Sequence, residues 1–394
     1  MNLVFLYAGE ILPERGGVQR VSSVLADYFE AKGINVFYLS LAKNELSSSS
    51  SSRQYFFPSS NNIEKNTLFL HTFLKTKEID ILINQSGISP EVSAYAYKAR
   101  EINVKVISVV HNSILTGIKN FSSLYKTKAQ KLNLDWLLPI ADKKIVNKFL
   151  LFLYKIKYKK HYSGLCMKSD IVILLSGKFR EELNYITGDR GNYSNILSIP
   201  NPISFIPEVV NLRNKKKELL YVGRIDTLYK RVDLLLEIWN KVYARFPDWE
   251  LKIVGGGGEM EDVIKMAESL RLQRVSFEGF QNPISYYRDA SIFCMTSSSE
   301  SFGMVLLEAM QYSVVPIAFN SYVSVTDIID DGENGILIKP FNCESYIKEL
   351  ISLMSEKSRC DIIAEKAQEK SMQFSIEKVG SVWVSVFENL MLSK

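Results

Sequence analysis

The sequence predicts an α/β protein built of two doubly wound, Rossmann-like domains in tandem. Short apolar segments rich in β-branched residues alternate with longer segments whose apolar residues recur at helical spacing, which is typical of parallel sheets with helical crossovers. The alternation pauses near residue 205 and then starts again. A length of 394 residues also suits two hydrophobic cores better than one.

The first series of elements fills residues 1–205. We expect its strands at Leu3–Tyr7, Val36–Leu41, Ile79–Ile83, Val104–Val110 and Ile171–Leu175. We expect its helices at Gly16–Lys32, which Gly33 ends, and at Pro90–Arg100. Six consecutive serines, Ser47–Ser52, predict a loop, and Ile199–Pro202 predicts the exit from the domain.

The second series fills residues 206–375 and follows a polar, basic segment, Glu208–Lys217, that we interpret as a linker. We expect its strands at Leu219–Val222, Leu251–Val254, Val275–Phe277, Ile292–Met295 and Val314–Ile317. We expect its helices at Val232–Phe246, Glu259–Leu270, Phe302–Tyr312 and Val325–Ile329. One more amphipathic helix, Ile376–Leu392, has no strand after it.

Composition limits the class of protein. The four cysteines lie far apart and there are three histidines, so neither a disulfide framework nor a structural or histidine-rich metal site is expected. No segment reaches the ~18 consecutive apolar residues of a membrane span, and we interpret Met1–Ala8 as a strand, not a signal peptide. We therefore expect a cytoplasmic protein. Residues 1–205 carry a net charge of +10 and residues 206–394 one of −5, so the first half is expected to meet an anionic partner.

Residues that directly follow the strands are the candidates for a ligand site, because open parallel sheets bind ligands beyond the carboxyl ends of their strands. Gly16 and Gly17 open the first helix, where a ligand can approach the backbone and N–H groups face an anion; a tight turn is an equally good interpretation. Gly223-Arg224 ends another strand, and Lys230 follows six residues later. Two cations at one strand end suit phosphate oxygens, and a solvated basic loop is the alternative.

Two further segments are candidates. Gly255–Gly258 follows an apolar strand and predicts a loop that a phosphate approaches. Glu300 and Glu308 lie on a loop and on the helix that it opens, eight residues or roughly 12 Å of helix apart. The N–H groups at the helix start would face a diphosphate; they belong to Phe302, Gly303 and Met304. Apolar neighbours predict a specific partner for Glu308, and an exposed helical glutamate is the alternative.

With these residues the chain resembles the retaining family-4 glycosyltransferases of the GT-B fold, of the type that builds bacterial capsule, exopolysaccharide and lipopolysaccharide. The resemblance rests on Glu300…Glu308, the family's E-x7-E motif, and on Gly223-Arg224…Lys230, with support from Asn201-Pro202, Gly279-Phe280 and Asp331–Gly335. It implies two domains that face each other across a cleft. Residues 1–205 would meet the acceptor and 206–375 the nucleotide-sugar, and the helix at about 376–394 would cross back to the first domain.

The resemblance also implies roles for residues. His111, which follows a strand, would contact the transferred sugar, as would Glu300, while Arg224 and Lys230 would neutralise the donor diphosphate. These four form the expected catalytic set. Glu308 would bind ribose, and Gly279 and Phe280 would lie near the base. The expected donor-binding positions are Gly16, Gly17, Gly223, Arg224, Lys230, Gly255, Gly279, Phe280, Glu300, Phe302, Gly303, Met304 and Glu308.

The implied activity is the retaining, metal-independent transfer of a hexose or N-acetylhexosamine from a nucleotide-sugar, with a UDP-sugar as the best guess. The acceptor would be a hydroxyl of a growing glycan or of a polyprenyl-diphosphate-linked glycan, and no cofactor is expected. A non-catalytic nucleotide-sugar sensor or partner subunit and a GT-B epimerase are the alternatives. The chain departs from the family pattern at Arg231, Asn112 and Ser301 and in the glycine-free loop Asn320–Ile329, which leaves the sugar open.

A basic segment, Lys143–Lys160, holds seven lysines and no acidic residue, interleaved with apolar and aromatic residues. One interpretation is contact with an anionic membrane surface, at the inner face of the cytoplasmic membrane. The other is a helix whose residues Phe149–Leu153 pack in the core between solvated lysines. Binding to nucleic acid is not expected, because no recognition motif accompanies the charge.

Overall fold

The protein is described by a computed structural model covering residues 1–43, 53–58, 62–115, 118, 144–188, 193–205 and 210–392. The chain divides into two compact units. Unit 1 comprises Met1–Ile114, Phe152–Ser204 and Phe374–Lys394, and unit 2 comprises Leu115–Leu151 and Phe205–Gln373. The loop predicted for Ser47–Ser52 lies outside the described residues.

Unit 1 is built on a seven-stranded parallel sheet in the order β3-β2-β1-β4-β5-β6-β7. The strands are β1 Asn2–Tyr7, β2 Asn35–Ser40, β3 Gln54–Phe56, β4 Ile81–Asn84, β5 Lys105–Val110, β6 Ile171–Leu174 and β7 Ile196–Ser198. The helices are α1 Gly17–Ala31, α2 Ile63–Thr76, α3 Pro90–Ala99, α8 Phe179–Thr187 and α16 Ile376–Leu392. Helix α7, Lys144–Lys168, begins in a segment of unit 2 and continues into unit 1 from Phe152. The central strands are buried on both faces, which explains their continuous apolar runs.

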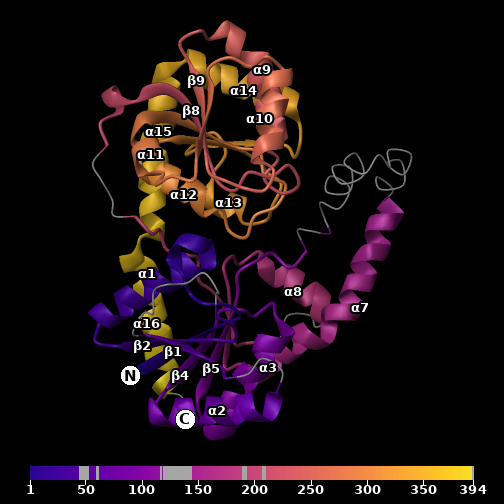
Figure 1. Cartoon of the computed structure of the whole chain (residues 1–394), viewed down its shortest axis with the longest axis vertical. Helices are drawn as coiled ribbons and strands as arrows, with labels where there is room; N and C mark the ends of the chain where they lie inside the picture. Colours follow the sequence, from indigo (N-terminus) through magenta and orange to yellow (C-terminus); the bar gives the residue numbers. More distant parts are fainter. Residues whose placement is uncertain are drawn as a thin grey trace. The chain divides into compact units, whose positions relative to one another are not determined.

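Unit 2 is built on a six-stranded parallel sheet in the order β10-β9-β8-β11-β12-β13. The strands are β8 Lys216–Val222, β9 Glu250–Val254, β10 Val275–Gly279, β11 Ala290–Met295, β12 Val315–Phe319 and β13 Ile336–Ile338. The helices are α9 Val232–Val242, α10 Met260–Ser269, α11 Ile284–Asp289, α12 Met304–Gln311, α13 Val325–Ile328, α14 Cys343–Ser355 and α15 Lys357–Ser371. In Figure 1, α9 and α10 lie on one side of this sheet and α11 and α15 on the other.

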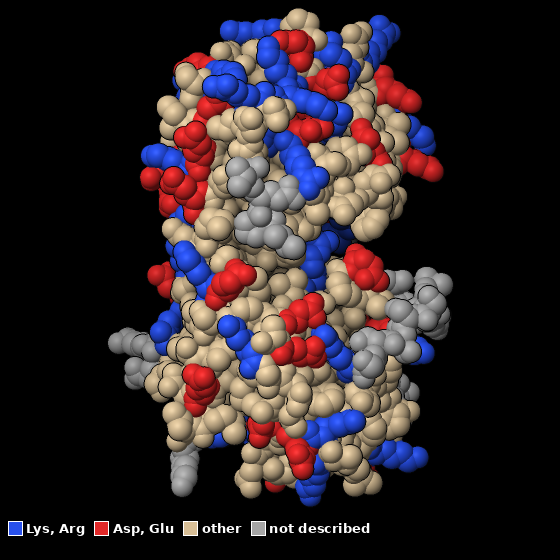
Figure 2. All heavy atoms as spheres, turned by 90° about the vertical axis from the view of Figure 1, so that its left-hand side faces the viewer, with Lys and Arg blue, Asp and Glu red and all other residues tan. Residues whose placement is uncertain are grey.

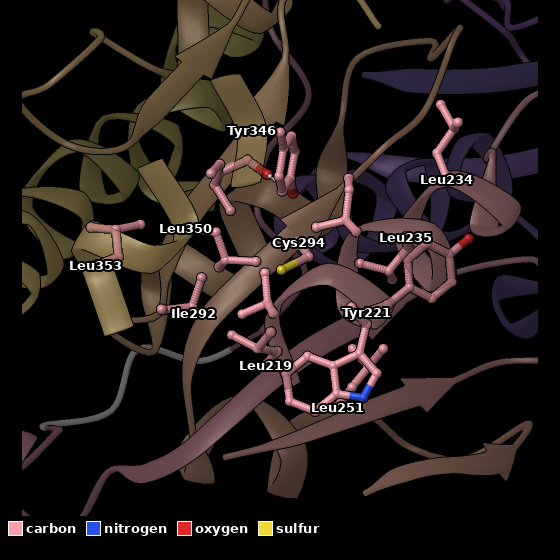
Figure 3. Packing of buried hydrophobic residues seen from close by; sticks show 14 of the residues in the cluster. Leu219, Tyr221, Leu234, Leu235, Leu251, Ile292, Cys294, Tyr346, Leu350 and Leu353 are labelled. Carbon is pink, nitrogen blue, oxygen red and sulfur yellow. Dashed lines mark hydrogen bonds between the residues drawn. The ribbon is translucent and has the colours of Figure 1, made fainter. Parts of the chain in front are cut away.

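The hydrophobic core of unit 2 lies between its sheet and the helices that cover one face of the sheet. Figure 3 shows Leu219 and Cys294 from the strands among Tyr346 and Leu350 of α14. The Tyr346 hydroxyl donates a hydrogen bond of 2.9 Å to the carbonyl of Ile317, so this buried polar group is satisfied. The core therefore holds the strands whose carboxyl ends carry the candidate site.

The helix at the C-terminus packs on unit 1, as predicted. The rings of Phe29 in α1 and Phe387 in α16 lie 5.0 Å apart, and the N–H of Ile203 donates to the carbonyl of Phe374. Gly380 in α16 faces the Tyr28 ring so closely that an added Cβ would lie 2.4 Å from a ring carbon. The two helices are thus matched in shape where they touch.

The α/β fold with two parallel sheets is confirmed, and several details of the expected elements are corrected. The predicted linker Glu208–Lys217 ends too late, because Lys216 and Lys217 already belong to β8, where they pair with Asp289 and Asp248. Helix α9 ends at Val242, and a 3₁₀ turn, Tyr243–Arg245, follows. Three long helices were not predicted, namely α2, α14 and α15, and neither were the shorter elements β3, β7, β13, α8 and α11.

Helix α7 contradicts one interpretation of the basic segment. Phe149, Phe152 and Leu153 are 58%, 55% and 45% exposed, so they do not pack in the core. Lys143, the first residue of that segment, lies outside the described residues. Within the described ranges, no helix is long and apolar enough to cross a membrane.

Candidate active site

The candidate residues of unit 2 all follow the carboxyl ends of its parallel strands. Val222 of β8 pairs with Val254 of β9, and Gly279 at the end of β10 pairs with the same Val254. Met295 of β11 pairs with Ala318 of β12 in the same sheet. The structure therefore brings segments 223–231, 255–259, 279–280, 296–304 and 320–324 to one edge of one sheet.

Two glycine-containing loops cross at this edge with their backbones in contact. A Cβ on Gly255, whose φ is +143°, would lie 1.8 Å from the carbonyl oxygen of Gly223. The same atom on Gly257 would lie 2.3 Å from the carbonyl oxygen of Ile225. The N–H of Ile225 donates to the Gly256 carbonyl at 2.9 Å. Close backbone packing therefore explains Gly255 and Gly257, because no other residue fits there.

Asp226 shapes the loop that carries the two predicted cations. Its carboxylate accepts hydrogen bonds from the N–H groups of Tyr229 at 2.6 Å and Lys230 at 2.9 Å, and from Nε of Arg224 at 2.8 Å. Burial raises the pKa of Asp226, but these hydrogen bonds outweigh burial and hold the pKa below its ordinary value. The sequence analysis gave Asp226 no role, although it stands two residues after Arg224 at the same strand end.

Arg224 presents its guanidinium to solvent. Its side chain is 62% exposed, and its one described ion pair is through Nε to Asp226. The hydrogen bond to that carboxylate raises the pKa of Arg224 above its ordinary value, so the group stays charged. A guanidinium anchored at one nitrogen on the rim of a sheet edge is suited to binding phosphate oxygens.

Lys230 and Glu300 form an ion pair at the same edge. Nζ of Lys230 lies 2.5 Å from Oε1 of Glu300, and the two side chains are 20% and 11% exposed. The Ser297 hydroxyl donates to the same carboxylate oxygen at 2.7 Å. A ligand that binds either charge must therefore compete with an existing, half-buried partner.

Helix α12 begins beside this pair, two residues later than predicted. Its N-cap is Gly303, which has φ +101° and no side chain to cap the first N–H groups. A Cβ on Gly303 would lie 2.4 Å from the Tyr322 hydroxyl oxygen, so the turn requires glycine. The Phe302 side chain, directly before Gly303, is 1% exposed and anchors the turn in the core. A helix start without a side-chain cap, next to Lys230, can bind an anion.

Glu308 lies in the second turn of α12 and is 2% exposed, so the interpretation as an exposed helical glutamate is wrong. The Tyr287 hydroxyl of α11 donates to its carboxylate at 3.0 Å. Tyr287 is itself fully buried and stacks on Tyr312. The predicted specific partner of Glu308 is thus Tyr287, whose role no sequence pattern indicated.

Gly279 and Phe280 lie at the end of β10, where Gly279 takes a φ of +71°. The N–H of Gly255 donates to the Gly279 carbonyl at 2.7 Å, which ties this turn to the glycine loops. Phe280 is 77% exposed. An aromatic ring left in solvent at this edge is a surface on which a planar base can stack.

The predicted residues of unit 1 lie at the corresponding edge of its own sheet, with Gly16 and Gly17 after β1 and His111 after β5. A Cβ on Gly17 would meet no atom within 4 Å, and one on Gly16 would meet only a glutamine oxygen at 3.8 Å. Gly16 has an extended backbone with φ 176°. Packing therefore does not require glycine at positions 16 and 17, whereas it does at Gly255 and Gly303. Close approach of a ligand to the backbone is then a reason for glycine at positions 16 and 17.

His111 is buried and held by Gln85, which follows β4. Nε2 of His111 lies 2.6 Å from Oε1 of Gln85, so in the tautomer that makes this hydrogen bond Nε2–H donates. Burial lowers the pKa of His111 to about 4, so the ring is neutral near pH 7. Gln85 was missed, although a polar residue directly after a strand is the signal that selected His111.

The charged groups at these edges do not form a metal centre in the described part of the chain, where no cluster of three histidine, cysteine or acidic side chains could hold an ion. The site instead offers cations, a helix start and carboxylates to a ligand. These are groups suited to a phosphate and to sugar hydroxyls.

Comparison with known proteins finds a family match over most of unit 2 and solved structures that share the fold. Residues 203–370 match the family described as Glycosyl transferases group 1. Over this segment the chain is similar to the group 1 glycosyltransferases. The matched segment contains Arg224, Lys230, Glu300 and Glu308, so the family match covers the candidate site at the edge of the unit 2 sheet.

Two relatives illustrate the sequence similarity. An uncharacterized glycosyltransferase of Haemophilus influenzae is 33% identical over 195 residues, which are 49% of this chain and 55% of that protein. The amylovoran biosynthesis glycosyltransferase AmsD of Erwinia amylovora is 26% identical over 74% of this chain and 79% of its own length. The chain thus spans about half the length of the first of these relatives.

Two solved structures share the fold over nearly the whole chain. The apo form of the lipopolysaccharide outer core galactosyltransferase WaaB has a TM-score of 0.71 at 20% identity, covering 99% of this chain and 100% of that one. Anabaena Alr3699/HepE in complex with UDP and glucose has a TM-score of 0.71 at 15% identity, with the same coverage. The chain therefore has the GT-B fold.

Proposed function

We propose that the chain is a glycosyltransferase that moves a hexose or an N-acetylhexosamine from a nucleotide-diphosphate donor to a hydroxyl of a growing bacterial surface glycan. The observation that carries the proposal is the cluster of Arg224, Lys230 and Glu300 at the edge of the unit 2 sheet. Its two cations, one carboxylate and a nearby helix start are the groups that a diphosphate joined to a sugar requires.

The donor diphosphate binds Arg224, Lys230 and the backbone N–H groups at the start of α12. These N–H groups belong to Phe302, Gly303 and Met304. As the bond to the sugar breaks, negative charge grows on the diphosphate, and these groups stabilise it because they are already in place. When the donor binds, Lys230 separates from Glu300 and binds the phosphate, and Glu300 accepts hydrogen bonds from hydroxyls of the sugar. Breaking this one ion pair therefore frees a cation for the diphosphate and a carboxylate for the sugar.

The nucleoside occupies the part of the edge between β10 and α12. Phe280 stacks on the base next to Gly279, and Glu308 binds the ribose after its carboxylate turns from Tyr287. In unit 1, Gly16 and Gly17 leave room for a phosphate close to the backbone, and His111 offers a neutral ring to a sugar hydroxyl. We favour UDP as the nucleotide, and the complex of Anabaena HepE with UDP and glucose supports this choice.

We further propose that the reaction retains the anomeric configuration and needs no metal. The acceptor hydroxyl attacks from the face that the phosphate leaves, and the leaving phosphate takes its proton. The cationic residues then supply the charge that a metal would otherwise supply. The acceptor is a lipid-linked glycan that the enzyme meets at the inner face of the cytoplasmic membrane. One relative, AmsD, is named for amylovoran biosynthesis.

The test is a thermal shift with UDP, GDP and ADP on the wild type, on Arg224→Ala and on Lys241→Ala. Arg224 and Lys241 are both exposed cations of unit 2, but Lys241 lies at the end of α9, away from the loops of the site. A ligand at ~100 times its Kd adds about 2.7 kcal/mol to the stability of the folded state. We expect one nucleotide to raise the Tm of the wild type and of Lys241→Ala, and to raise that of Arg224→Ala clearly less.

The outcome also separates the alternatives. Equal shifts for all three proteins, or none, would contradict the placement of the diphosphate. A nucleotide shift without transfer of sugar from the matching donor to any hydroxyl acceptor would favour a sensor or partner subunit. Release of a rearranged sugar without an acceptor would favour an epimerase.

A further inference from the structure

Helix α7 carries an apolar stripe that points into solvent. Ile145, Phe149, Phe152 and Ile156 are 78%, 58%, 55% and 61% exposed. They stand at spacings of four, three and four residues, which places them on one line along the helix. Large apolar side chains in a contiguous exposed row mark a surface that meets another apolar phase.

Lysines border this stripe on both sides. At 100° per residue, Lys148 and Lys159 lie on one flank and Lys160 on the other, and all three are exposed. Helix α7 contains no aspartate or glutamate over its 25 residues. By contrast, Figure 2 shows another face of the molecule, on which acidic and basic side chains are interspersed. The uniform charge of α7 is therefore a local property and not that of the whole surface.

The lysines and the apolar side chains of α7 together indicate what kind of partner binds this surface. A second copy of the helix would bring lysine against lysine, and such like-charge contact is unfavourable. A nucleic acid would use the lysines but would leave the isoleucine and phenylalanine side chains in water. An anionic lipid surface uses both, because the apolar side chains enter the headgroup region while long lysine side chains reach the phosphates.

We propose that the lysine-bordered stripe of α7 docks on an anionic membrane surface, with the helix lying in the plane of the interface. This contact deepens the proposed function by bringing the enzyme to a lipid-linked acceptor. It does not depend on that function, because vesicle binding requires neither a donor nor an acceptor. Each lysine near such a surface contributes about fivefold to binding, and the effect weakens as salt screens the charges.

The experiment is flotation of the full chain with vesicles of phosphatidylglycerol and phosphatidylethanolamine, and with vesicles of phosphatidylcholine alone, at low and high salt. We expect binding to the anionic vesicles that falls at high salt, and little binding to phosphatidylcholine. The triple variant Lys148→Gln, Lys159→Gln, Lys160→Gln and the triple variant Phe149→Ser, Phe152→Ser, Ile156→Ser should each bind the anionic vesicles at least tenfold more weakly.

Matched controls test whether binding depends on the α7 stripe or on any exposed lysines and apolar side chains of the protein. The variant Lys241→Gln, Lys265→Gln, Lys348→Gln removes three exposed lysines of unit 2, and Ile63→Ser with Leu68→Ser removes two exposed apolar side chains of α2 that are 68% and 70% exposed. Both controls should bind like the wild type. A Tm without added ligand equal to that of the wild type would show that the α7 variants are folded.

Four results would overturn the proposal. The first is no flotation of the wild type with anionic vesicles. The second is equal loss of binding in the α7 variants and the controls. The third is self-association of the wild type that the serine variant abolishes while vesicle binding persists, which would assign the stripe to a second copy. Tight binding to duplex DNA without vesicle binding would likewise overturn it. None of these results bears on the nucleotide site, which the Tm measurement tests separately.

Discussion

The charge state of His111 decides what this residue can contribute to the reaction. Burial lowers the pKa of its ring to about 4, and Gln85 accepts the hydrogen bond from one ring nitrogen. A neutral ring can bind a sugar hydroxyl by hydrogen bonding but cannot stabilise the diphosphate as a cation. In the proposed reaction that task therefore falls to Arg224 and Lys230.

The lowered pKa of His111 predicts a pH dependence of stability. Between pH 6.5 and about 4 the unfolded chain binds a proton at this residue and the folded chain does not, so the free energy of unfolding falls as the pH falls. The loss from this one group amounts to roughly 3 kcal/mol at most across the window. In His111→Gln we expect a flatter decline of Tm from pH 6.5 to pH 4.

The control for that measurement is His71→Gln, which removes a half-buried histidine that contacts the carbonyl of Lys98. Its decline of Tm should follow that of the wild type. His161, whose pKa burial also lowers, is present in all three proteins and does not affect the comparison. Equal slopes in the wild type and His111→Gln would contradict the burial of this ring.

At the scale of elements, two kinds of glycine look alike in the sequence and differ in the structure. Gly255 and Gly303 are fixed by backbone or side-chain atoms within 2.4 Å of the position where a Cβ would lie. Gly17 has open space around it. A glycine at a strand end therefore predicts that another group comes close to its backbone. The sequence does not show whether this group belongs to the protein itself or to a ligand.

This difference predicts unequal effects of alanine at neighbouring positions. Gly255→Ala should lower the free energy of unfolding of unit 2 by at least about 2 kcal/mol, because it adds a Cβ against the Gly223 carbonyl at a positive φ. Gly256→Ala places its Cβ 3.9 Å from the nearest atom and should change stability by about 0.5 kcal/mol or less. Urea denaturation of both variants checks the pair, and similar midpoints would contradict the crossing of the two loops.

Most buried strands and the sheet edge that carries the candidate site could be predicted from the sequence, whereas the long helices α2, α14 and α15 were missed. Continuous apolar runs such as β5 and β11 are buried on both faces, and the rule that ligands bind at carboxyl ends of strands then selected Arg224, Lys230 and His111. Short elements such as β3 and β7 carry too few residues for a period to show. Partners distant in sequence, such as Tyr287 for Glu308, depend on packing between helices that no local pattern encodes.

At the scale of the whole molecule, unit 1 is assembled from segments that are far apart in the sequence. Its last segment, Phe374–Lys394, contributes α16, which packs on α1 near the start of the chain. Unit 2 lies between them in the sequence and has a separate core. A substitution in α16 should therefore act on unit 1, although it lies next to unit 2 along the chain.

Phe387→Ala tests this assignment. The side chain is fully buried against Phe29 and Trp383, and its removal should cost about 3–5 kcal/mol of the stability of unit 1. Leu350→Ala, in the core of unit 2, is the matched substitution and should cost about 2–5 kcal/mol there. In calorimetry with and without the bound nucleotide, Leu350→Ala should lower the transition that the nucleotide raises. Phe387→Ala should lower the other transition, and a fall in the nucleotide-dependent transition alone would show that α16 stabilises unit 2 instead.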